Sequence, residues 1–441
     1  MGRFGTDGIR GEVGTEITAD LAFALGRAVG HRFGGPGRAV VLGRDTRRSG
    51  EMLSAALTAG LAATGTDIVD LGTVTTPCLV HASTAAAFAA GVMVSASHNP
   101  APDNGLKVVV DGRKADDGAE AELEQLIAEP SPIPQRPNEE LGRSRLDSGS
   151  IDAYRRHLVA AAGDAFAGLR IGIDCANGSA SGIAPDLFRA LGAEVTVLFD
   201  APDGLNINAG CGSTHPERLA ATVAAAGLDI GFAFDGDADR LIAVDERGDL
   251  VDGDAVMGIC AIQRLAAGTL RNNVLVATVM SNGGLERALT QAGGRMVRTP
   301  VGDRHVFEAM EREDAVIGGE QSGHIIFRDR ATTGDGLLTA IELVRAVREA
   351  GEALSELAGR IPRLPQVMIN SAVRRRDDWE GDAEFLSAIR HATDRMGDRG
   401  RVLVRPSGTE PRIRIMVEGD DPAEIEEMAR ELATLAEARL N

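Results

Sequence analysis

The stretch RAVVLGRDTRRSGEMLSAALTAGLAATGTDIVDL, residues 38–71, decides the fold prediction. Arg38 to Leu42 is an apolar run of the kind found in buried strands. After a loop, the run from about Ser49 to Ala63 has the length and composition of a helix. Gly65 is typical of a helix end, and Asp67 to Leu71 is predicted to be a second strand. The stretch is therefore predicted to fold as strand, helix, strand.

The same order of elements recurs twice further along the chain. The predicted elements are the strand Leu169 to Ile173, the helix Ile183 to Leu191 before Gly192, the strand Glu194 to Phe199, the strand Asn273 to Thr278, the helix Gly284 to Ala292 before Gly293, and the strand Arg295 to Thr299. Strands that alternate with helices favour parallel α/β sheets. Copies that start about 100 residues or more apart predict three related α/β domains.

The C-terminal part has a different pattern, which predicts a small two-layer α+β domain. Its predicted elements are a strand from about Gln366, a helix from Gly381 to Arg395, strands from Arg401 to Val404 and from Arg412 to Glu418, and a helix from Pro422 to Leu440. A chain of 441 residues is too long for one core, so several domains are expected. We predict an α/β protein of four domains, at residues 1–150, 151–252, 253–365 and 366–441. The proline-rich segment Pro130 to Pro137 is predicted to be a surface loop of the first domain.

The composition excludes some classes of partner. The formal net charge is −19, and charge of this sign repels nucleic acid and anionic membranes. Aromatic residues make up only 3% of the chain, which leaves few rings to stack on bases. We therefore expect no nucleic-acid and no membrane partner. A phosphorylated substrate would also be repelled, so its site must concentrate positive charge, and Lys107 and Lys114 are the only lysines.

The cysteines and the apolar segments predict a cytoplasmic protein. The four cysteines lie far apart without metal-ligand spacing and are interpreted as reduced: Cys78, Cys175, Cys211 and Cys260. The N-terminus has no apolar signal-peptide stretch, and nowhere do about 18 apolar residues run together.

The first of four polar motifs is the serine loop, residues 95–100 (SASHNP), which follows the apolar run Gly91 to Val94. We interpret it as a hydroxyl-rich loop delivered by a strand. Ser97 could act as a nucleophile or carry a phosphoryl group, and Lys107 or His98 could hold its charge. An ordinary turn is the alternative, since Ser, Asn and Pro are common turn residues.

The second motif is the acidic loop, residues 235–240 (DGDADR), which follows the apolar run Ile230 to Phe234. It carries three carboxylates at alternate positions: Asp235, Asp237 and Asp239. Like charges this close repel one another unless a cation lies among them. The spacing also resembles the start of an EF-hand calcium loop, but a strand precedes it and its twelfth residue, Glu246, lies in a predicted turn. We favour Mg²⁺ with open positions for phosphate oxygens, and a solvated acidic turn is the remaining alternative.

The third motif is the sugar loop, residues 318–324 (GGEQSGH). Its glycines present Glu320 and Ser322, which suit sugar hydroxyls, and His324, which suits proton transfer. Taken alone this motif is weak, because glycine-rich loops with polar residues are common.

The fourth motif is the phosphate loop, residues 405–411 (RPSGTEP). Hydroxyls, loop amides and guanidinium groups together make a cradle for a phosphate, and the residues that would form it are Arg405, Ser407, Gly408, Thr409 and Arg414. Arg405 or Arg414 could bind the phosphate with two hydrogen bonds. The alternative is a hairpin loop with its arginines facing solvent.

Each motif follows a predicted strand in a different domain, so a cleft between the four domains would gather all of them. Phosphoryl transfer between a serine and a phosphosugar needs a serine, a metal, a sugar site and a phosphate site together. The four motifs, in this order and spacing, resemble those of the α-D-phosphohexomutase family over essentially the whole chain. Residues 4–11 (FGTDGIRG), 319–324, 333–336 (TGDG) and 405–411 are most similar to its bacterial phosphoglucosamine mutase branch. One departure is Val108 to Val110, where that branch often has aromatic residues.

The resemblance implies four domains, three of them related, around a central cleft. It implies that Ser97 must be phosphorylated for activity, and that one Mg²⁺ per chain is held by Ser97, Asp235, Asp237 and Asp239. It places Arg10, Lys107 and His324 near the transferring phosphate, and it assigns Glu320, Ser322 and the loop from Arg405 to Thr409 to substrate. We expect His98, Arg240 and Arg414 to contact substrate as well. The implied substrate is glucosamine 6-phosphate, which becomes glucosamine 1-phosphate for cell-wall precursor synthesis.

The implied mechanism has phospho-Ser97 give its phosphoryl group to a sugar hydroxyl. The bisphosphorylated sugar then turns round, and its other phosphate returns to Ser97. Lys107 or His324 is the expected base, and the C-terminal domain is the expected lid. The alternatives are a phosphoglucomutase or phosphomannomutase with the same mechanism, a metal-dependent phosphatase, and a calcium-binding module. The sequence leaves the oligomeric state open, with a homodimer among the states it allows.

Overall fold

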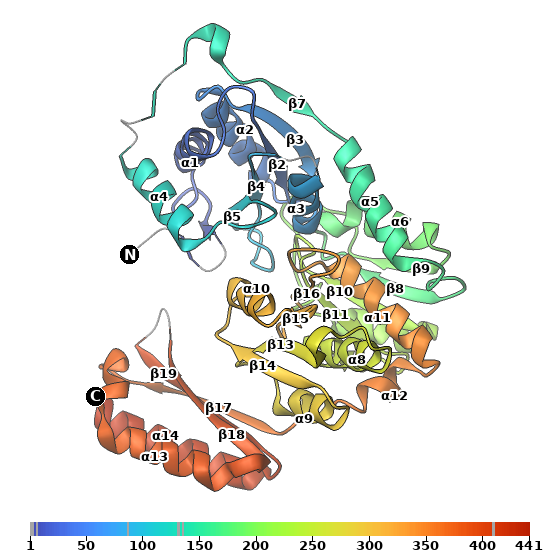
Figure 1. Ribbon diagram of the computed structural model, residues 1–441, viewed down its shortest axis with the longest axis vertical. Coiled ribbons are helices and arrows are strands. Elements are labelled where there is room, and N and C mark those ends of the chain that lie inside the picture. Colours follow the sequence, from blue (N-terminus) through green and yellow to red (C-terminus); the bar gives the residue numbers. More distant parts are fainter. Residues whose placement is uncertain (1–3, 6–7, 86–87, 130–132, 135, 408–410) are drawn as a thin grey trace. The chain divides into compact units, whose positions relative to one another are not determined.

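The computed structural model describes residues 4–5, 8–85, 88–129, 133–134, 136–407 and 411–441 (Figure 1). The chain divides into two compact units, one formed by Met1–Met280 with Ala292–Arg360 and the other by Ser281–Gln291 with Ile361–Asn441. Among the described residues the first unit contains three sheets and the second contains a fourth.

The first sheet has the strand order β1-β5-β4-β2-β3-β7, with β6 paired to β5. Its strands are β1 Ile9–Glu12, β2 Ala39–Arg44, β3 Asp67–Thr73, β4 Ala90–Val94, β5 Asp103–Val110, β6 Arg113–Lys114 and β7 Ser144–Leu146, and its helices are α1 Ala19–Arg32, α2 Ser49–Ala62, α3 Thr76–Ala85 and α4 Asp117–Ala128. Alternate residues of the central strands face opposite sides of the sheet. Val40 and Leu42 share one core with Leu53 and Leu57 of α2.

The second and third sheets are smaller and follow in order along the chain. The second contains β8 Arg170–Asp174, β9 Glu194–Leu198, β10 Ile230–Phe234, β11 Leu241–Val244 and β12 Leu250–Val251, with helices α5 Gly149–Ala162, α6 Ala184–Ala190 and α7 Glu217–Ala226 in the same part of the chain. The third contains β13 Val274–Thr278, β14 Arg295–Thr299, β15 Ile317–Gly319 and β16 Ile325–Phe327, with helices α8 Gly253–Ala266, α10 Asp303–Arg312, α11 Gly336–Ala350 and α12 Leu354–Ala358.

The three sheets of the first unit share one core topology, which confirms the prediction of three related domains. The matching orders are β5-β4-β2-β3, β11-β10-β8-β9 and β16-β15-β13-β14. In each, three neighbouring strands are parallel and the fourth returns antiparallel after a loop. That loop is the serine loop in the first domain, the acidic loop in the second and the sugar loop in the third. The three motifs therefore occupy the same position in three copies of one fold.

The second unit contains the predicted two-layer α+β domain together with α9, a helix that the sequence analysis placed in the third domain. It consists of α9 Gly283–Gln291, β17 Gln366–Ala372, α13 Ala383–Met396, β18 Gly400–Pro406, β19 Arg412–Gly419 and α14 Pro422–Leu440. The sheet order is β17-β19-β18, with both pairs antiparallel. One face of the sheet packs on α13 and α14 around a core that includes Ile415, Phe385 and Leu432. The phosphate loop lies between β18 and β19.

The largest differences from the predicted elements are at edges and helix starts. Helix α13 begins at Ala383, two residues later than predicted, because the Asp382 carboxylate accepts the Phe385 amide at 2.9 Å and caps it. Strand β7 was not predicted, since its three residues are exposed and give no apolar signal. Within the segment 130–137, residues 130–132 and 135 lie outside the described residues. The domain boundaries and the central cleft stay predictions.

Within the described part of the chain, every helix is too short or too polar to cross a membrane.

Candidate active site

The serine loop and the acidic loop meet in the interior of the first unit. The Ser97 hydroxyl donates to Asp235 Oδ2 at 2.5 Å, and both residues are buried. The His98 Nδ1 atom lies 3.5 Å from the same hydroxyl. Ser97 has a φ of 52°, in the left-handed region that costs a residue other than glycine about 1–3 kcal/mol. The surrounding structure therefore holds Ser97 in this conformation.

A buried arginine that the sequence analysis did not single out holds the serine loop. The Arg47 guanidinium donates to four carbonyl oxygens of the loop and its exit: Ser97 at 3.1 Å, Asn99 at 2.7 Å, Pro100 at 2.5 Å and Asp103 at 2.9 Å. Its Nε pairs with Asp45 Oδ2 at 3.0 Å, and neither side chain is exposed. The only signal in the sequence is an Asp-x-Arg pair directly after a predicted strand of the same sheet, where side chains of neighbouring strands converge.

Two more side chains fix the loop. The Ser95 hydroxyl donates to Asp45 Oδ2 at 2.7 Å and accepts the Ser97 amide at 2.9 Å. Asn208, from the second domain, donates from Nδ2 to the carbonyl oxygens of Ser97 and Asn99, both at 2.9 Å. Residues from two domains thus set the position of the Ser97 hydroxyl.

We expect Arg47→Lys to lower the free energy of unfolding by about 3 kcal/mol or more. A lysine can still pair with Asp45, but it cannot reach the loop carbonyls together, and these would be left buried without donors. Urea unfolding followed by circular dichroism measures the change. Arg48→Lys is the matched control, because Arg48 is the next residue and is exposed. Equal stability of the two variants would contradict the role of Arg47 in holding the serine loop.

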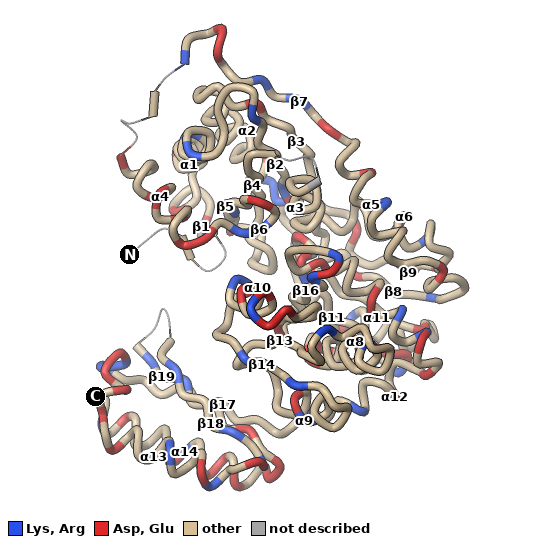
Figure 2. Tube along the Cα trace, in the orientation of Figure 1, with Lys and Arg blue, Asp and Glu red and all other residues tan. Residues whose placement is uncertain are grey.

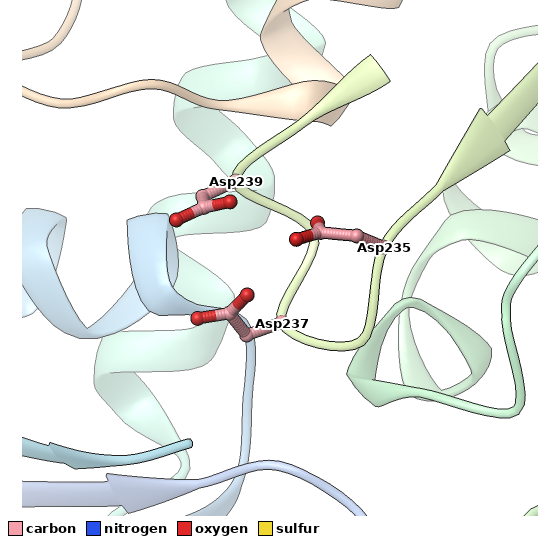
Figure 3. A group of neighbouring side chains, drawn as sticks. All are labelled: Asp235, Asp237 and Asp239. Atoms are coloured by element: carbon pink, nitrogen blue, oxygen red, sulfur yellow. The ribbon is translucent and has the colours of Figure 1, made fainter. Parts of the chain in front are cut away.

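The three aspartates of the acidic loop lie together between β10 and β11. Their side chains point toward one another (Figure 3), and one oxygen from each lies within 4.8 Å of the others. Gly236 allows the acidic loop to approach the serine loop, because a Cβ at this residue would stand 2.6 Å from the Ser97 carbonyl oxygen.

Cationic groups surround these carboxylates. Lys107 Nζ lies 2.8 Å from Asp237 Oδ2 and 3.6 Å from Asp239 Oδ2, and the Thr76 hydroxyl donates to Asp237 at 2.5 Å. Burial, then the charges of Asp239 and Asp237, raise the pKa of Asp235 well above its usual range. Burial opposes ionisation of Asp237 too, but Lys107 outweighs it and holds the pKa of Asp237 below its usual range.

The donor set fits a hard divalent cation. Asp237 Oδ1 and Asp239 Oδ1 are buried and have no hydrogen-bond partner among the described residues. Carboxylate and hydroxyl oxygens are the ligands that Mg²⁺ takes. An EF-hand needs a helix on each side of its loop, whereas strands β10 and β11 flank this one. Glu246, which would close a calcium loop, instead accepts the Ser355 amide at 3.3 Å.

Two arginines add positive charge at the same place. Arg10 Nη1 donates to the Ala96 carbonyl at 3.2 Å, and Arg240 Nε lies 3.8 Å from Asp239 Oδ1. The charges of Asp239 and Asp235 outweigh burial and raise the pKa of Arg240. Burial, Arg240 and Arg10 lower the pKa of His98 to about 4. The His98 ring is therefore neutral near pH 7, and positive charge is concentrated here in a chain of net charge −19.

The sugar loop joins this site from the third domain. The Leu241 amide donates to the Gly323 carbonyl at 3.0 Å, which ties the sugar loop to the end of the acidic loop. Glu320 Oε1 accepts the Gly302 amide at 3.0 Å, and the exposed Ser322 hydroxyl lies 3.4 Å from Glu320 Oε2. His324 is 3% exposed, and neither ring nitrogen has a hydrogen-bond partner within the described ranges.

The phosphate loop belongs to the second unit. Arg405 of β18 stands directly opposite Arg414 of β19 (Figure 2 shows the basic residues of this hairpin in blue). Burial, then the charge of Arg414, lower the pKa of Arg405. Like charges facing each other across two strands are unfavourable without an anion, so the pair suits a phosphate. Ser407 is buried, and Gly408 and Thr409 lie outside the described residues.

Known proteins match the chain over its whole length. Four domains described for phosphoglucomutase/phosphomannomutase match it in order: α/β/α domain I at residues 1–133, domain II at 152–248, domain III at 252–364 and the C-terminal domain at 368–435. The chain belongs to the phosphoglucomutase/phosphomannomutase family. The phosphohexomutase resemblance and the four-domain prediction are thereby confirmed.

Members of the phosphoglucomutase/phosphomannomutase family resemble this chain in sequence and in structure. This chain is 52% identical to phosphoglucosamine mutase of Symbiobacterium thermophilum, over 99% of each chain. A crystal structure of a family protein from Burkholderia thailandensis has a TM-score of 0.83 at 27% identity, covering 99% of this chain and 98% of that one. N-acetylphosphoglucosamine mutase of Aspergillus fumigatus, solved with GlcNAc-6P and magnesium, has a TM-score of 0.71 at 18% identity, covering 100% and 96%.

Proposed function

We propose that this protein is a phosphoglucosamine mutase, which interconverts glucosamine 6-phosphate and glucosamine 1-phosphate. The observation that carries the proposal is the buried Ser97 hydroxyl, 2.5 Å from Asp235 and next to the carboxylates that Lys107 contacts. Sequence identity of 52% to a phosphoglucosamine mutase over nearly the whole chain supports the choice of substrate.

In the proposed cycle Ser97 carries a phosphoryl group. Attack by a sugar hydroxyl on phosphorus forms the new P–O bond and breaks the bond to Ser97 Oγ, and the sugar hydroxyl gives its proton to a base. The bisphosphorylated sugar turns round, and the Ser97 hydroxyl then takes the other phosphoryl group by the reverse step. Lys107, Arg10 and Arg240 offset the charge on the transferring group.

The acidic loop and Ser97 would hold one Mg²⁺ through Ser97 Oγ, Asp235, Asp237 and Asp239. When bound, Mg²⁺ supplies Lewis-acid stabilisation of negative charge on the phosphoryl oxygens. Magnesium in the Aspergillus fumigatus enzyme supports this cofactor. Asp237 Oδ1 and Asp239 Oδ1, which accept no hydrogen bond from the described residues, support the location.

His324 is the better of the two candidate bases. Lys107 is already engaged by Asp237 and Asp239, at 2.8 and 3.6 Å. His324 is buried, and its ring nitrogens make no hydrogen bond to the described residues. A neutral imidazole in such a place can accept the proton of a sugar hydroxyl.

The remaining motifs bind the rest of the substrate. Glu320 and Ser322 bind sugar hydroxyls, with Glu320 held in place by the Gly302 amide. His98 and Arg240 bind the substrate beside Ser97. Arg405, Arg414 and Ser407, together with Gly408 and Thr409, bind the phosphate that is not reacting. The four buried, unpaired cysteines suit a reducing compartment, so we place the reaction in the cytoplasm.

Substrate competition tests the proposal. One preparation, activated with a catalytic amount of bisphosphorylated sugar, is assayed with glucosamine, glucose and mannose 6-phosphates. We expect kcat/KM for glucosamine 6-phosphate to exceed the other two by about 10²-fold or more, because a site built to bind a polar group discriminates against substrates that lack it. A preference for glucose or mannose phosphate would instead support the phosphoglucomutase or phosphomannomutase alternative.

A further inference from the structure

The two lysines of the chain both lie beside the candidate active site. They are the only lysines among 46 lysine and arginine residues. The Lys107 side chain is 2% exposed and that of Lys114 is 17% exposed, so neither is an ordinary surface lysine. Arginine serves as the cation at every other position, so lysine at these two places indicates a need for a compact ammonium group. Lys107 belongs to the site already described, whereas Lys114 has no role in it.

Lys114 forms an ion pair that joins the first and third domains. Its Nζ lies 2.5 Å from Asp303 Oδ2. Lys114 is on β6, which pairs with β5, the strand that carries Lys107. Asp303 begins α10, directly after Gly302, whose amide binds Glu320 of the sugar loop.

Asp303 in turn faces His324. The same Oδ2 atom that binds Lys114 lies 3.7 Å from His324 Nε2, and Asp303 Oδ1 accepts the Arg304 amide at 2.9 Å. Both oxygens are therefore fixed. Burial opposes the charge of Asp303, but the Lys114 ammonium group outweighs it and holds the pKa of Asp303 below its usual range. The carboxylate next to the imidazole is thus ionised.

The same edge of the imidazole is also closely packed. A Cβ on Gly334 would stand 2.5 Å from His324 Nε2 and 2.6 Å from Cδ2 and Cε1, so only glycine allows this contact. The next residue, Asp335, accepts the Tyr154 hydroxyl at 2.9 Å and the Leu338 amide at 3.0 Å, which anchors the segment. Gly334 and Asp303 both lie close to His324 Nε2, and the ring has no hydrogen bond to the described residues. Close packing and the charge of Asp303, rather than a hydrogen bond, therefore act on the orientation of His324.

We propose that Lys114 is a positioning residue for His324, acting through Asp303. The ammonium group draws Asp303 Oδ2 to the point from which it orients the imidazole toward the transferring group. A guanidinium at this position is longer and planar, and it would displace the carboxylate from His324. The proposal rests on the mutase activity proposed above, because His324 is the base of that reaction.

Kinetics of Lys114→Met and Lys114→Arg test the proposal. We expect Lys114→Met to lower kcat for glucosamine 6-phosphate by about 10²-fold, the effect of a small displacement of a catalytic group, with KM changed less than about twofold. Lys114→Arg keeps the positive charge, but we expect its kcat to be less than a tenth of the wild-type value.

Arg113→Met is the matched control. Arg113 is the neighbouring residue on β6, and its Nη2 lies 2.9 Å from Glu311 Oε1 of α10, so it joins the same two domains. The Arg113 side chain is 48% exposed and does not contact Asp303 or His324. We expect wild-type kcat within about twofold. A loss equal to that of Lys114→Met would show that the lysine only holds the domains together, and would overturn the proposal.

A double variant tests whether Lys114 acts through Asp303. If Lys114 acts through Asp303, the kcat of the double variant Lys114→Arg with Asp303→Asn should be about equal to the lower of the two single-variant kcat values, and not below it. The positioning role would be overturned if the fold-loss of kcat in the double variant equalled the product of the two single-variant losses. A wild-type kcat for Lys114→Arg would overturn it as well. If Lys114→Met does not fold, as judged by circular dichroism, the Lys114→Arg and Asp303→Asn variants carry the test. Wild-type protein without mutase activity would instead contradict the proposed function.

Discussion

Replacing Ser97 by alanine is expected to reduce mutase turnover by about 10⁴-fold or more, the order of loss that follows removal of a covalent nucleophile. Alanine keeps the Cβ, so the left-handed backbone at φ 52° is no more strained than with serine. The Arg47 and Asn208 contacts are to the main-chain carbonyl of Ser97 and do not need its hydroxyl. The loss would therefore report the missing hydroxyl alone.

Ser148→Ala is the control for this variant, since Ser148 is exposed and lies outside the four loops. The measurement is the steady-state rate of glucosamine 1-phosphate formation, with thermal unfolding of each variant recorded alongside. Turnover of Ser97→Ala near the wild-type rate would rule out Ser97 as the phosphoryl carrier, whatever its stability.

The second large effect concerns the acidic loop. We expect Asp239→Asn to raise the Mg²⁺ concentration that gives half-maximal activity by at least about tenfold, because it removes one of three carboxylates from the cation site. Asp239 is a better choice than Asp237, which is bound by Lys107 at 2.8 Å and by Thr76. Loss of the Asp237 carboxylate would leave the buried Lys107 poorly paired. A lower stability of the variant could then be mistaken for weaker metal binding.

Two measurements complete this test. Wild-type activity should disappear with excess EDTA and return when Mg²⁺ is added. Asp249→Asn, an exposed carboxylate just beyond β11, should keep the wild-type Mg²⁺ dependence. An unchanged Mg²⁺ requirement in Asp239→Asn would mean that Lys107, rather than a metal ion, balances the carboxylates.

The buried elements were predictable because their pattern is strong. Strand β10, Ile230–Phe234, and helix α14, Pro422–Leu440, have the predicted bounds. A run of five buried apolar residues in a parallel sheet admits few other structures. The edge strands β7 and β12 were missed because two or three residues, all but one of them exposed, carry no periodic signal.

The polar loops of the site could be predicted from the sequence, but the side-chain contacts that fix those loops could not. The serine, acidic and sugar loops each follow a predicted strand. Their placement at the carboxyl ends of strands could therefore be predicted. The contacts that fix them join residues far apart in sequence, such as Asn208 with Ser97 and Lys114 with Asp303. Only folding brings such pairs together, and no local pattern in one sequence records them. Asp45 and Arg47 gave the one partial signal, a charged pair just after a buried strand.

The most direct test of the account is the mass of the protein before and after exposure to glucosamine 1,6-bisphosphate. We expect intact protein to gain about 80 Da, one phosphoryl group, carried by a peptide that contains Ser97. Subsequent incubation with glucosamine 6-phosphate should remove the added mass and regenerate the bisphosphate. No gain in mass, or a phosphoryl group on a residue other than Ser97, would contradict the central claim that Ser97 carries the phosphoryl group.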